Sequence, residues 1–466
     1  MVALRLWMGS RIAFASEDAL ITFRYAANWA HGLGPVFNAG ERVLGCTSPP
    51  WMAWIALGIR LGLGPLAWAR GTLLVADVVT LLAFVALLER HASRTSAWCF
   101  AVFFAAWPYL CALYASGFEM GMMIALLALS AWLIDRRHPV AGSALGLLAI
   151  FRPEGFVAAA VLSMWARSRD RIVATAVLTA GALILFLYYG SPVPQSLLAK
   201  AAIYGTPGPL HAQAWWDWAF PLPLAGSLAR TSEGANFFLL SLLAAPAAVA
   251  GARALWGRRR CALAGVVAAG AVVWLGYLLA GASYFFWYFV TPLLAWVLLA
   301  SVGMPALVRS RLVYASLALA LAGHWTYELH LYQGRAAAEG GTFGDIGAYV
   351  ASLARPGETI MLEPIGTIGW RCLQQRILDE VGLVSPEGQA RRLRGAGWYA
   401  DIVDERRPQW LVGRAGTLVF GGSFVGAGAP FRSAAERAAV LAPYVVVARS
   451  DTTRDQAQTL LVLRRR

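Results

Sequence analysis

The residues that could do chemistry concentrate in one polar stretch, residues 16–51, of a chain that is otherwise mostly apolar. The stretch opens on two adjacent carboxylates, Glu17 and Asp18. A membrane protein keeps such a segment at a membrane edge only where water or a polar ligand meets it. Paired acids at that place can supply a general base and an electrostatic or metal-binding partner. The other candidate ligand-binding side chains of the stretch are Arg24, Tyr25, Asn38 and Glu41.

The acid pair also has a purely structural interpretation. A helix beginning near Ala19 would favour acids in its first turn, because the positive end of the helix dipole stabilises negative charge. Residues 16–18 would then cap the start of this helix. Taken alone, the pair favours this helix start over a catalytic role, so the rest of the chain decides between them.

Three further polar positions have a functional and a structural interpretation. Glu119 could hold a polar ligand or cap the helix that follows it. Arg152 and Glu154 could form an ion pair that closes a broken helix, and an ion pair within a membrane is usually functional. Lys200 is the single lysine among 39 basic residues, and it could bind an anion or extend its amine to the membrane surface from a helix end.

The composition places the chain among polytopic membrane proteins. Its 466 residues are 59% hydrophobic and only 14% charged, whereas soluble domains carry about 25% charged residues. The net charge of +14 comes largely from arginines in short loops between apolar runs. We assign this charge to membrane topology and not to a nucleic-acid partner. The five cysteines form no CxxC pair and the six histidines no HExxH, so no zinc site or disulfide framework follows.

Apolar runs predict the transmembrane helices. Several runs are shorter than the roughly 20 residues of an untilted span, so their boundaries are soft. Residues 1–14 are too short to span, and they predict either an interfacial helix or the end of a first span whose start is missing. The predicted spans are 71–88, 97–115, 118–134, 139–151, 154–166, 172–189, 236–253, 261–280, 285–303 and 312–330.

Arginine clusters follow every second predicted span, for example at Arg136 and Arg137. The positive-inside rule puts those loops in the cytoplasm. The polar motifs, including the long loop 190–235, then all lie on the external side. The apolar segment 49–63 must not cross if this alternation holds, so it predicts an in-plane or re-entrant helix.

The composition changes after about residue 333. Residues 342–466 have ordinary charge density, and their pattern predicts a small extracytoplasmic α/β domain. We therefore expect a transmembrane catalytic domain over 1–332 and a soluble domain over 333–466. Helices are predicted at 345–353 and 374–381, and strands at 359–362, 410–412, 444–448 and 459–463.

The stretch 16–51 resembles the first external loop of the GT-C superfamily of glycosyltransferases, above all the group with the mycobacterial arabinofuranosyltransferases. That loop begins Asp-Asp-Ala, and here Glu17 replaces the first Asp. Because its side chain is longer, the change could move the role of base to Asp18. Leu44 stands where an acid is frequent, and Cys46 replaces a Tyr. The matching residues are Asp18-Ala19, Arg24-Tyr25, Asn28, Gly32, Gly34, Asn38, Gly40, Glu41, Gly45, Thr47 and Trp51.

The resemblance extends along nearly the whole chain through short motifs that keep their order. Each motif is weak by itself, and their order and spacing carry the match. The motifs are Ser116-Gly117-Phe118-Glu119, Arg152-Pro153-Glu154-Gly155, Pro192-Val193-Pro194-Gln195 with Ala199-Lys200, and the segments 365–369 and 377–383.

The resemblance implies a polytopic α-helical GT-C-like membrane protein, with about 10–11 transmembrane helices and a C-terminal α/β domain, in the bacterial inner membrane. It implies transfer of one sugar from a polyprenyl-phosphate donor to an extracytoplasmic glycan, lipid or protein. Glu17 or Asp18 would be the base, with a divalent cation at this pair left open. Lys200 and Arg152 would bind the leaving phosphate. The implied substrate-binding residues are Arg24, Tyr25, Asn38, Glu41, Glu119, Glu154 and Gln195.

Two other functions stay open at this point. A transporter or flippase of a lipid-linked glycan would place its charges inside the spans and often carries internal repeats. A non-catalytic membrane scaffold would leave the polar stretch 16–51 unexplained. Replacement of Asp18 separates both from an enzyme, because only an enzyme uses Asp18 as a base.

Overall fold

The computed structural model describes residues 1–12, 15–204, 232–257, 261–282, 285–308, 340–419, 428–450 and 459–466, with isolated positions between 310 and 333 and at 422. The chain forms two compact units. The first unit contains Met1–Ala13, Leu66–Ile184 and Ala212–Gln333. The second unit contains Phe14–Pro65, Leu185–His211 and Gly334–Arg466. Residues 16–51 therefore share a unit with the C-terminal part of the chain.

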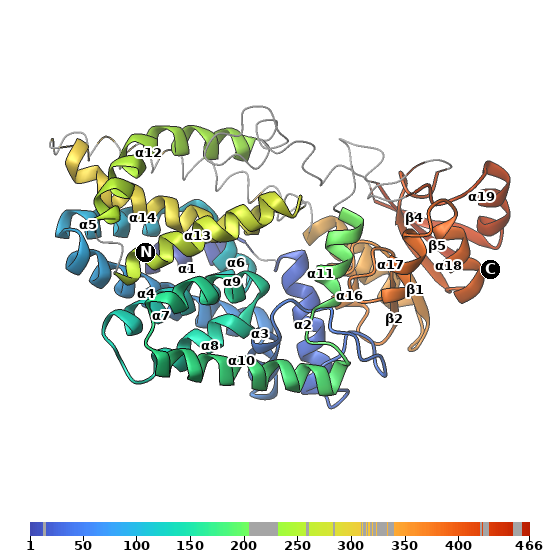
Figure 1. The fold of residues 1–466 in the computed structure, drawn as a ribbon. Helices are drawn as coiled ribbons and strands as arrows, with labels where there is room; N and C mark the ends of the chain where they lie inside the picture. The colour runs from blue at the N-terminus through green and yellow to red at the C-terminus, as the bar shows by residue number, and fades with distance from the viewer. Residues whose placement is uncertain are drawn as a thin grey trace. The chain divides into compact units, whose positions relative to one another are not determined.

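The first unit is built from helices (Figure 1). Short, sharp breaks separate several of them, and Pro108 and Pro153 start new helices after two of these breaks. Proline suits a first helical position because its missing N–H has no partner there. The helices are α1 (Val2–Arg11), α4 (Pro65–His91), α5 (Arg94–Ala106), α6 (Pro108–Ser116), α7 (Met120–Asp135), α8 (Ala141–Phe151), α9 (Pro153–Leu162), η1 (Ser163–Trp165), α10 (Ser168–Tyr189), α12 (Ser232–Trp256), α13 (Ala262–Leu279), η4 (Phe286–Phe289) and α14 (Val290–Leu307).

Several of these helices can cross a membrane. Within the described residues, four helices are long and apolar enough, or five if the bent pair around Trp107 forms one span. The four are α4, α10, α13 and the segment Trp287–Leu307, and α7 and α8 are shorter apolar helices. The chain is therefore a multi-pass membrane protein. The total of 10–11 spans stays a prediction, because most of the predicted span 312–330 lies outside the described residues.

Small residues let the helices of the first unit approach closely. A Cβ atom added to Gly251 of α12 would lie 1.9 Å from the backbone oxygen of Leu299 in α14. A Cβ atom added to Gly303 of α14 would lie equally close, at 1.9 Å, to the oxygen of Ala247. Neither position accepts a side chain, so α12 and α14 pack backbone against backbone, as small residues allow in membranes.

The second unit combines short helices with a five-stranded sheet. The helices are α2 (Glu17–Ala30), α3 (Pro49–Arg60), α11 (Gln195–Ala199), η2 (Lys200–Tyr204), a helix over 340–353, α16 (Thr367–Arg371), α17 (Pro386–Arg392), α18 (Trp398–Arg406) and α19 (Ala434–Leu441). The strands are β1 (Thr359–Leu362), β2 (Arg376–Asp379), β3 (Trp410–Arg414), β4 (Tyr444–Arg449) and β5 (Leu460–Arg465). The predicted strands and the predicted helix at 345–353 are confirmed. The predicted helix at 374–381 is wrong, because this segment contains β2.

The sheet has the order β2-β1-β3-β5-β4. Strand β1 pairs in parallel with β2 and β3, while β5 is antiparallel to β3 and β4. Strand β2 is thus an edge strand. The carboxyl ends of β1, β2 and β3 lie at one end of the sheet, where ligand-binding loops of parallel sheets usually gather.

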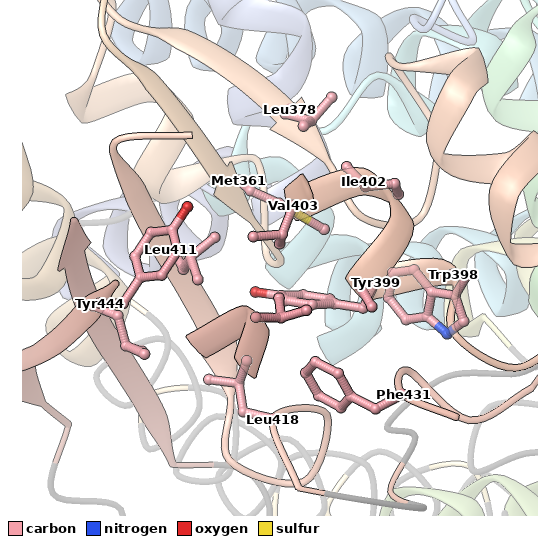
Figure 2. Close-up of a cluster of buried hydrophobic side chains, with 13 residues drawn as sticks. Met361, Leu378, Trp398, Tyr399, Ile402, Val403, Leu411, Leu418, Phe431 and Tyr444 are labelled. Carbon is pink, nitrogen blue, oxygen red and sulfur yellow. The ribbon is translucent and has the colours of Figure 1, made fainter. Parts of the chain in front are cut away.

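One face of the sheet is covered by α18 through a buried apolar cluster (Figure 2). Trp398 and Tyr399 of α18 lie edge to face, with ring centroids 5.4 Å apart, and Phe431 contacts Tyr399. Met361, Leu378 and Leu411 contribute one side chain from each of the three parallel strands. This cluster fixes the sheet, and with it the loops that follow β1 and β2.

Candidate functional site

The N-terminus of α2 positions the predicted acid pair. Ser16 caps the helix, because its hydroxyl accepts a hydrogen bond from the Ala19 backbone N–H at 3.3 Å. Glu17 and Asp18 occupy the first helical turn, as the structural interpretation expected. They also have side-chain partners from elsewhere in the second unit, so the two interpretations are compatible.

Glu17 is held by the loop that follows β1. Its carboxylate accepts hydrogen bonds from the Gly366 N–H, from the Thr367 N–H at 2.8 Å and from the Thr367 hydroxyl at 2.6 Å. A Cβ atom added to Gly366 would lie 2.0 Å from the Glu17 backbone oxygen. Position 366 therefore requires glycine for this close approach. Three donors on one carboxylate fix its orientation.

Asp18 pairs with the single lysine. The Nζ atom of Lys200 lies 3.1 Å from Oδ2 of Asp18, and the two side chains are 11% and 25% exposed. Lys200 stands where α11 continues into η2, and its amine is turned into the protein. Asp18 is thus a partly exposed acid with a cation beside it.

Arg24 joins α2 to the C-terminal part of the second unit. The side chain is 1% exposed and its guanidinium lies over the Phe37 ring, 4.6 Å from the centroid. Burial lowers the pKa of Arg24 to about 10, so the group remains charged at neutral pH. It donates to five acceptors, which are the backbone oxygens of Phe37, Gly369, Cys372 and Gln375 and the side-chain oxygen of Asn38.

Asn38 covers the free edge of the sheet. Its amide nitrogen donates to the Ile377 oxygen at 2.8 Å, and its amide oxygen accepts from the Ile377 N–H at 2.9 Å. Ile377 lies in β2, so one side chain takes the place of a neighbouring strand. Glu41 adds an ion pair to Arg376 of the same strand at 2.5 Å. The loop after α2 therefore completes the sheet.

Tyr25 and Gln195 make similar contacts within the second unit. The buried Tyr25 hydroxyl donates to the Val43 oxygen at 2.7 Å and accepts from the Gly45 N–H at 2.9 Å. The Gln195 amide donates to the Gly382 oxygen at 3.1 Å and to the side chain of Gln389 at 2.6 Å. The predicted substrate contacts of Arg24, Tyr25, Asn38, Glu41 and Gln195 stay predictions, and each of these residues has a structural partner.

The remaining predicted residues form a buried cluster in the first unit. Arg152 is the extended residue between α8 and α9, and its guanidinium donates two hydrogen bonds of 3.1 Å to the carboxylate of Glu154. It also pairs with Glu119, and the Tyr277 hydroxyl donates to Glu154 at 2.6 Å. The cluster thus contains one cation and two carboxylates. Lys200 and Arg152, both predicted to bind phosphate, belong to different compact units.

Replacement of Arg152 tests how this cluster is held together. We expect Arg152→Met to lower the free energy of unfolding by about 3 kcal/mol, because two buried carboxylates would lose their shared cation. Thermal unfolding of the detergent-purified protein measures this change. Glu119→Gln is the comparison, since it removes one of the two negative charges and should change the stability by less than about 1 kcal/mol. Equal losses in both variants would contradict a shared cation.

Acids also lie at the carboxyl ends of the strands, and no role was predicted for them from the sequence, although Asp379 and Glu380 belong to the motif segment 377–383. Burial raises the pKa of Asp379 to about 6, although the N–H groups of Val381 and Val384 donate to it at 2.8 and 3.0 Å. Burial, with the nearby Glu363, raises the pKa of Glu380 to about 8. Glu363 pairs with Arg414 at 2.6 Å. An acid directly after a short apolar strand was the available signal for this cluster.

A metal centre has no ready set of ligands here. Among the described residues, no group of three or more His, Cys, Asp and Glu side chains could hold a metal ion. Glu17 faces N–H and O–H donors, and Asp18 faces the Lys200 ammonium. A divalent cation at the acid pair stays a prediction.

Comparison with known proteins gives matches in sequence and in fold. Residues 328–460 match a family model described as a domain of unknown function, DUF8728. The terminal β-(1→2)-arabinofuranosyltransferase of Mycobacterium tuberculosis is 31% identical over 231 residues. This alignment covers 42% of the chain and 36% of the relative, so the chain matches about a third of the relative's length.

Two solved structures share the arrangement of nearly the whole chain. ArnT from Cupriavidus metallidurans bound to undecaprenyl phosphate has a TM-score of 0.58 at 11% identity, and the match covers 99% of this chain and 97% of ArnT. The Archaeoglobus fulgidus oligosaccharyltransferase tethered with an acceptor peptide has a TM-score of 0.55 at 11% identity, over 89% of this chain and 69% of that chain. At these identities the likeness establishes the architecture alone, and the chain shares the fold of these two structures.

Proposed function

We propose that this protein transfers one sugar from a polyprenyl-phosphate donor to an acceptor hydroxyl or amide outside the cytoplasm. The acceptor is a cell-envelope glycan, a lipid or a protein. The site lies at the N-terminus of α2, on the external face of the bacterial inner membrane, and the C-terminal part of the chain helps to hold the acceptor. The positive-inside pattern of the sequence supports this orientation.

The relatives support the class of reaction. ArnT carries a polyprenyl phosphate in its structure, the oligosaccharyltransferase carries an acceptor peptide, and the mycobacterial relative is named as an arabinofuranosyltransferase. A donor of this kind supplies its own leaving group, a lipid phosphate. It leaves the protein two tasks, which are to accept the proton of the acceptor and to neutralise the phosphate.

The Asp18–Lys200 pair is the observation that carries the proposal. It joins a partly exposed carboxylate to an ammonium at 3.1 Å, so one group for each task lies in one place. Glu17 is tied by three hydrogen bonds to residues 366–367 and is less suited to move a proton. We therefore give the role of base to Asp18 and a positioning role to Glu17.

The reaction follows from these positions. Asp18 accepts the proton of the acceptor as the acceptor oxygen or nitrogen bonds to the anomeric carbon of the sugar. The bond between that carbon and the phosphate oxygen breaks, and its electron pair leaves with the lipid phosphate. The Lys200 ammonium then faces the new phosphate charge. Arg24 and Asn38 hold the loop in the geometry that this step needs.

Retention of the donor tests the role of Lys200. We expect the purified wild-type protein to carry a polyprenyl-phosphate sugar and Lys200→Ala to retain about tenfold less, because the ammonium is the phosphate's cation. Native mass spectrometry measures both and gives the mass of the sugar. Lys200→Arg keeps the charge and serves as the control, with retention closer to wild type.

Equal retention by wild type and Lys200→Ala would show that Lys200 is not the phosphate anchor. A retained lipid that is never converted when acceptor is supplied would favour the transporter or the scaffold. Conversion by the wild-type protein would exclude both.

A further inference from the structure

A basic cavity of about 760 Å³ opens among helix ends of the first unit. It lies at the C-terminal ends of α4 and α7, beside η1 and the start of α13, and shares no residue with the clusters described above. The residues that determine its charge are Arg90, Asp135, Arg136 and Arg137, and Trp165 and Ala262 also line it.

The charges around the cavity do not cancel. The Asp135 carboxylate contacts His91 at 2.6 Å and Arg90 at 3.3 Å, so the aspartate is already neutralised. Arg136 and Arg137 are exposed, and within the described part of the chain neither forms an ion pair, although the Arg136 guanidinium lies over the Trp132 ring, 5.9 Å from its centroid. Two guanidiniums are therefore available to an anion.

Arg137 has a backbone conformation that is energetically unfavourable for a residue other than glycine. Its φ angle is 52°, in the left-handed region that favours glycine. The N–H of Arg137 donates to the Ile134 oxygen at 3.0 Å, and that of His138 donates to the Leu133 oxygen at 2.9 Å. Helices that end with this pair of hydrogen bonds usually have glycine at the position that Arg137 occupies here. An arginine there weakens the turn and adds a cation to the cavity.

Two neighbouring features suit a phosphate at the level of lipid headgroups. Helix α13 begins at the cavity, and its first N–H groups have no partner within the helix, so its N-terminus favours an anion. The cavity lies at the ends of α4 and α13, two helices able to span a membrane. Trp165 at its wall is the residue type that prefers the interface.

We propose that this cavity binds the phosphate of an anionic phospholipid, with phosphatidylglycerol as the simplest example. The positive-inside rule puts the arginine-rich loop at Arg136 and Arg137 in the cytoplasm. The cavity is therefore expected on the cytoplasmic side, opposite to the predicted catalytic loops. A basic cavity between membrane helices on that side is suited to an anionic headgroup. The lipid would hold the cytoplasmic ends of α4, α7 and α13 together. This lipid site is separate from the proposed site for the sugar donor.

Lipid competition tests the proposal on the full-length protein in detergent. Native mass spectrometry, with equal amounts of phosphatidylglycerol and phosphatidylcholine, should show preferential retention of phosphatidylglycerol. Each arginine should contribute about fivefold, so Arg136→Ala with Arg137→Gly should lower the preference by about 25-fold. Arg169→Ala is the matched control, because it removes an exposed arginine on the same predicted side outside the cavity.

The glycine variant separates binding from folding. Arg137→Gly should keep or raise the melting temperature, since glycine suits the backbone at this position, while it weakens lipid retention. Equal retention of both lipids by wild type would overturn the proposal. So would an equal effect of Arg169→Ala, or displacement of the lipid by millimolar inorganic phosphate, which would identify a site for a soluble anion.

Discussion

Asp18→Asn should lower the rate of sugar transfer by about a hundredfold, the size expected when general-base assistance is lost. Asparagine is nearly isosteric with aspartate and still offers an oxygen to Lys200 at the position of the present 3.1 Å contact. It cannot accept a proton at neutral pH. The loss should therefore appear in kcat, while retention of the donor and the melting temperature stay close to wild type.

The measurement is transfer from a synthetic polyprenyl-phosphate sugar to an acceptor in detergent, followed at saturating donor. Asp404→Asn is the matched control, because it makes the same chemical change at an exposed position on α18. Glu17→Gln is a different kind of variant. Its amide would direct N–H groups toward the donors of Gly366 and Thr367, so it should lower stability as well as rate. A rate for Asp18→Asn within about threefold of wild type would exclude Asp18 as the base.

The sequence indicated the region of the site through its residue types. It did not show which groups these residues contact in the folded protein. Asn38 and Arg24 were recognisable as unusual in an apolar chain, and a ligand was the natural partner to expect. Their partners in the structure are backbone groups of Ile377, Gly369 and Cys372, more than 300 positions away along the chain. When the partner of a side chain is a backbone group, the sequence contains no complementary residue type that identifies it, because almost every residue carries the same backbone groups.

The edge strand β2 shows why one element was mispredicted. The segment Gln374–Val381 is rich in Gln, Arg, Asp and Glu, which suit a helix or a loop better than a strand. Only part of it is a strand, and that part gains its pairing from β1 on one side and from Asn38 on the other. Tertiary contacts decide the outcome here. By contrast, Tyr444–Ala448 begins with four β-favouring residues and is a strand, as predicted.

Arg24→Met should be the most destabilising single substitution considered, lowering the free energy of unfolding by at least about 4 kcal/mol. Methionine fills much of the volume but donates no hydrogen bond. The backbone oxygens of Gly369, Cys372 and Gln375 would be left buried without this donor, and each such loss costs about 1–3 kcal/mol. These oxygens lie in and after α16, so the loss should loosen the loop that holds Glu17.

Chemical unfolding of the purified protein, with tryptophan fluorescence as the signal, measures this effect. Arg394→Met is the matched control, because Arg394 is exposed and its replacement should change the stability by less than about 0.5 kcal/mol. Arg24→Lys should fall between the two, since one ammonium reaches fewer of the five acceptors than a planar guanidinium. If Arg24→Met were as stable as wild type but inactive, Arg24 would be a substrate-binding residue. If the variant loses stability and activity together, the arginine of the Arg-Tyr motif holds α2 against the C-terminal part of the chain, and the acid pair depends on that contact.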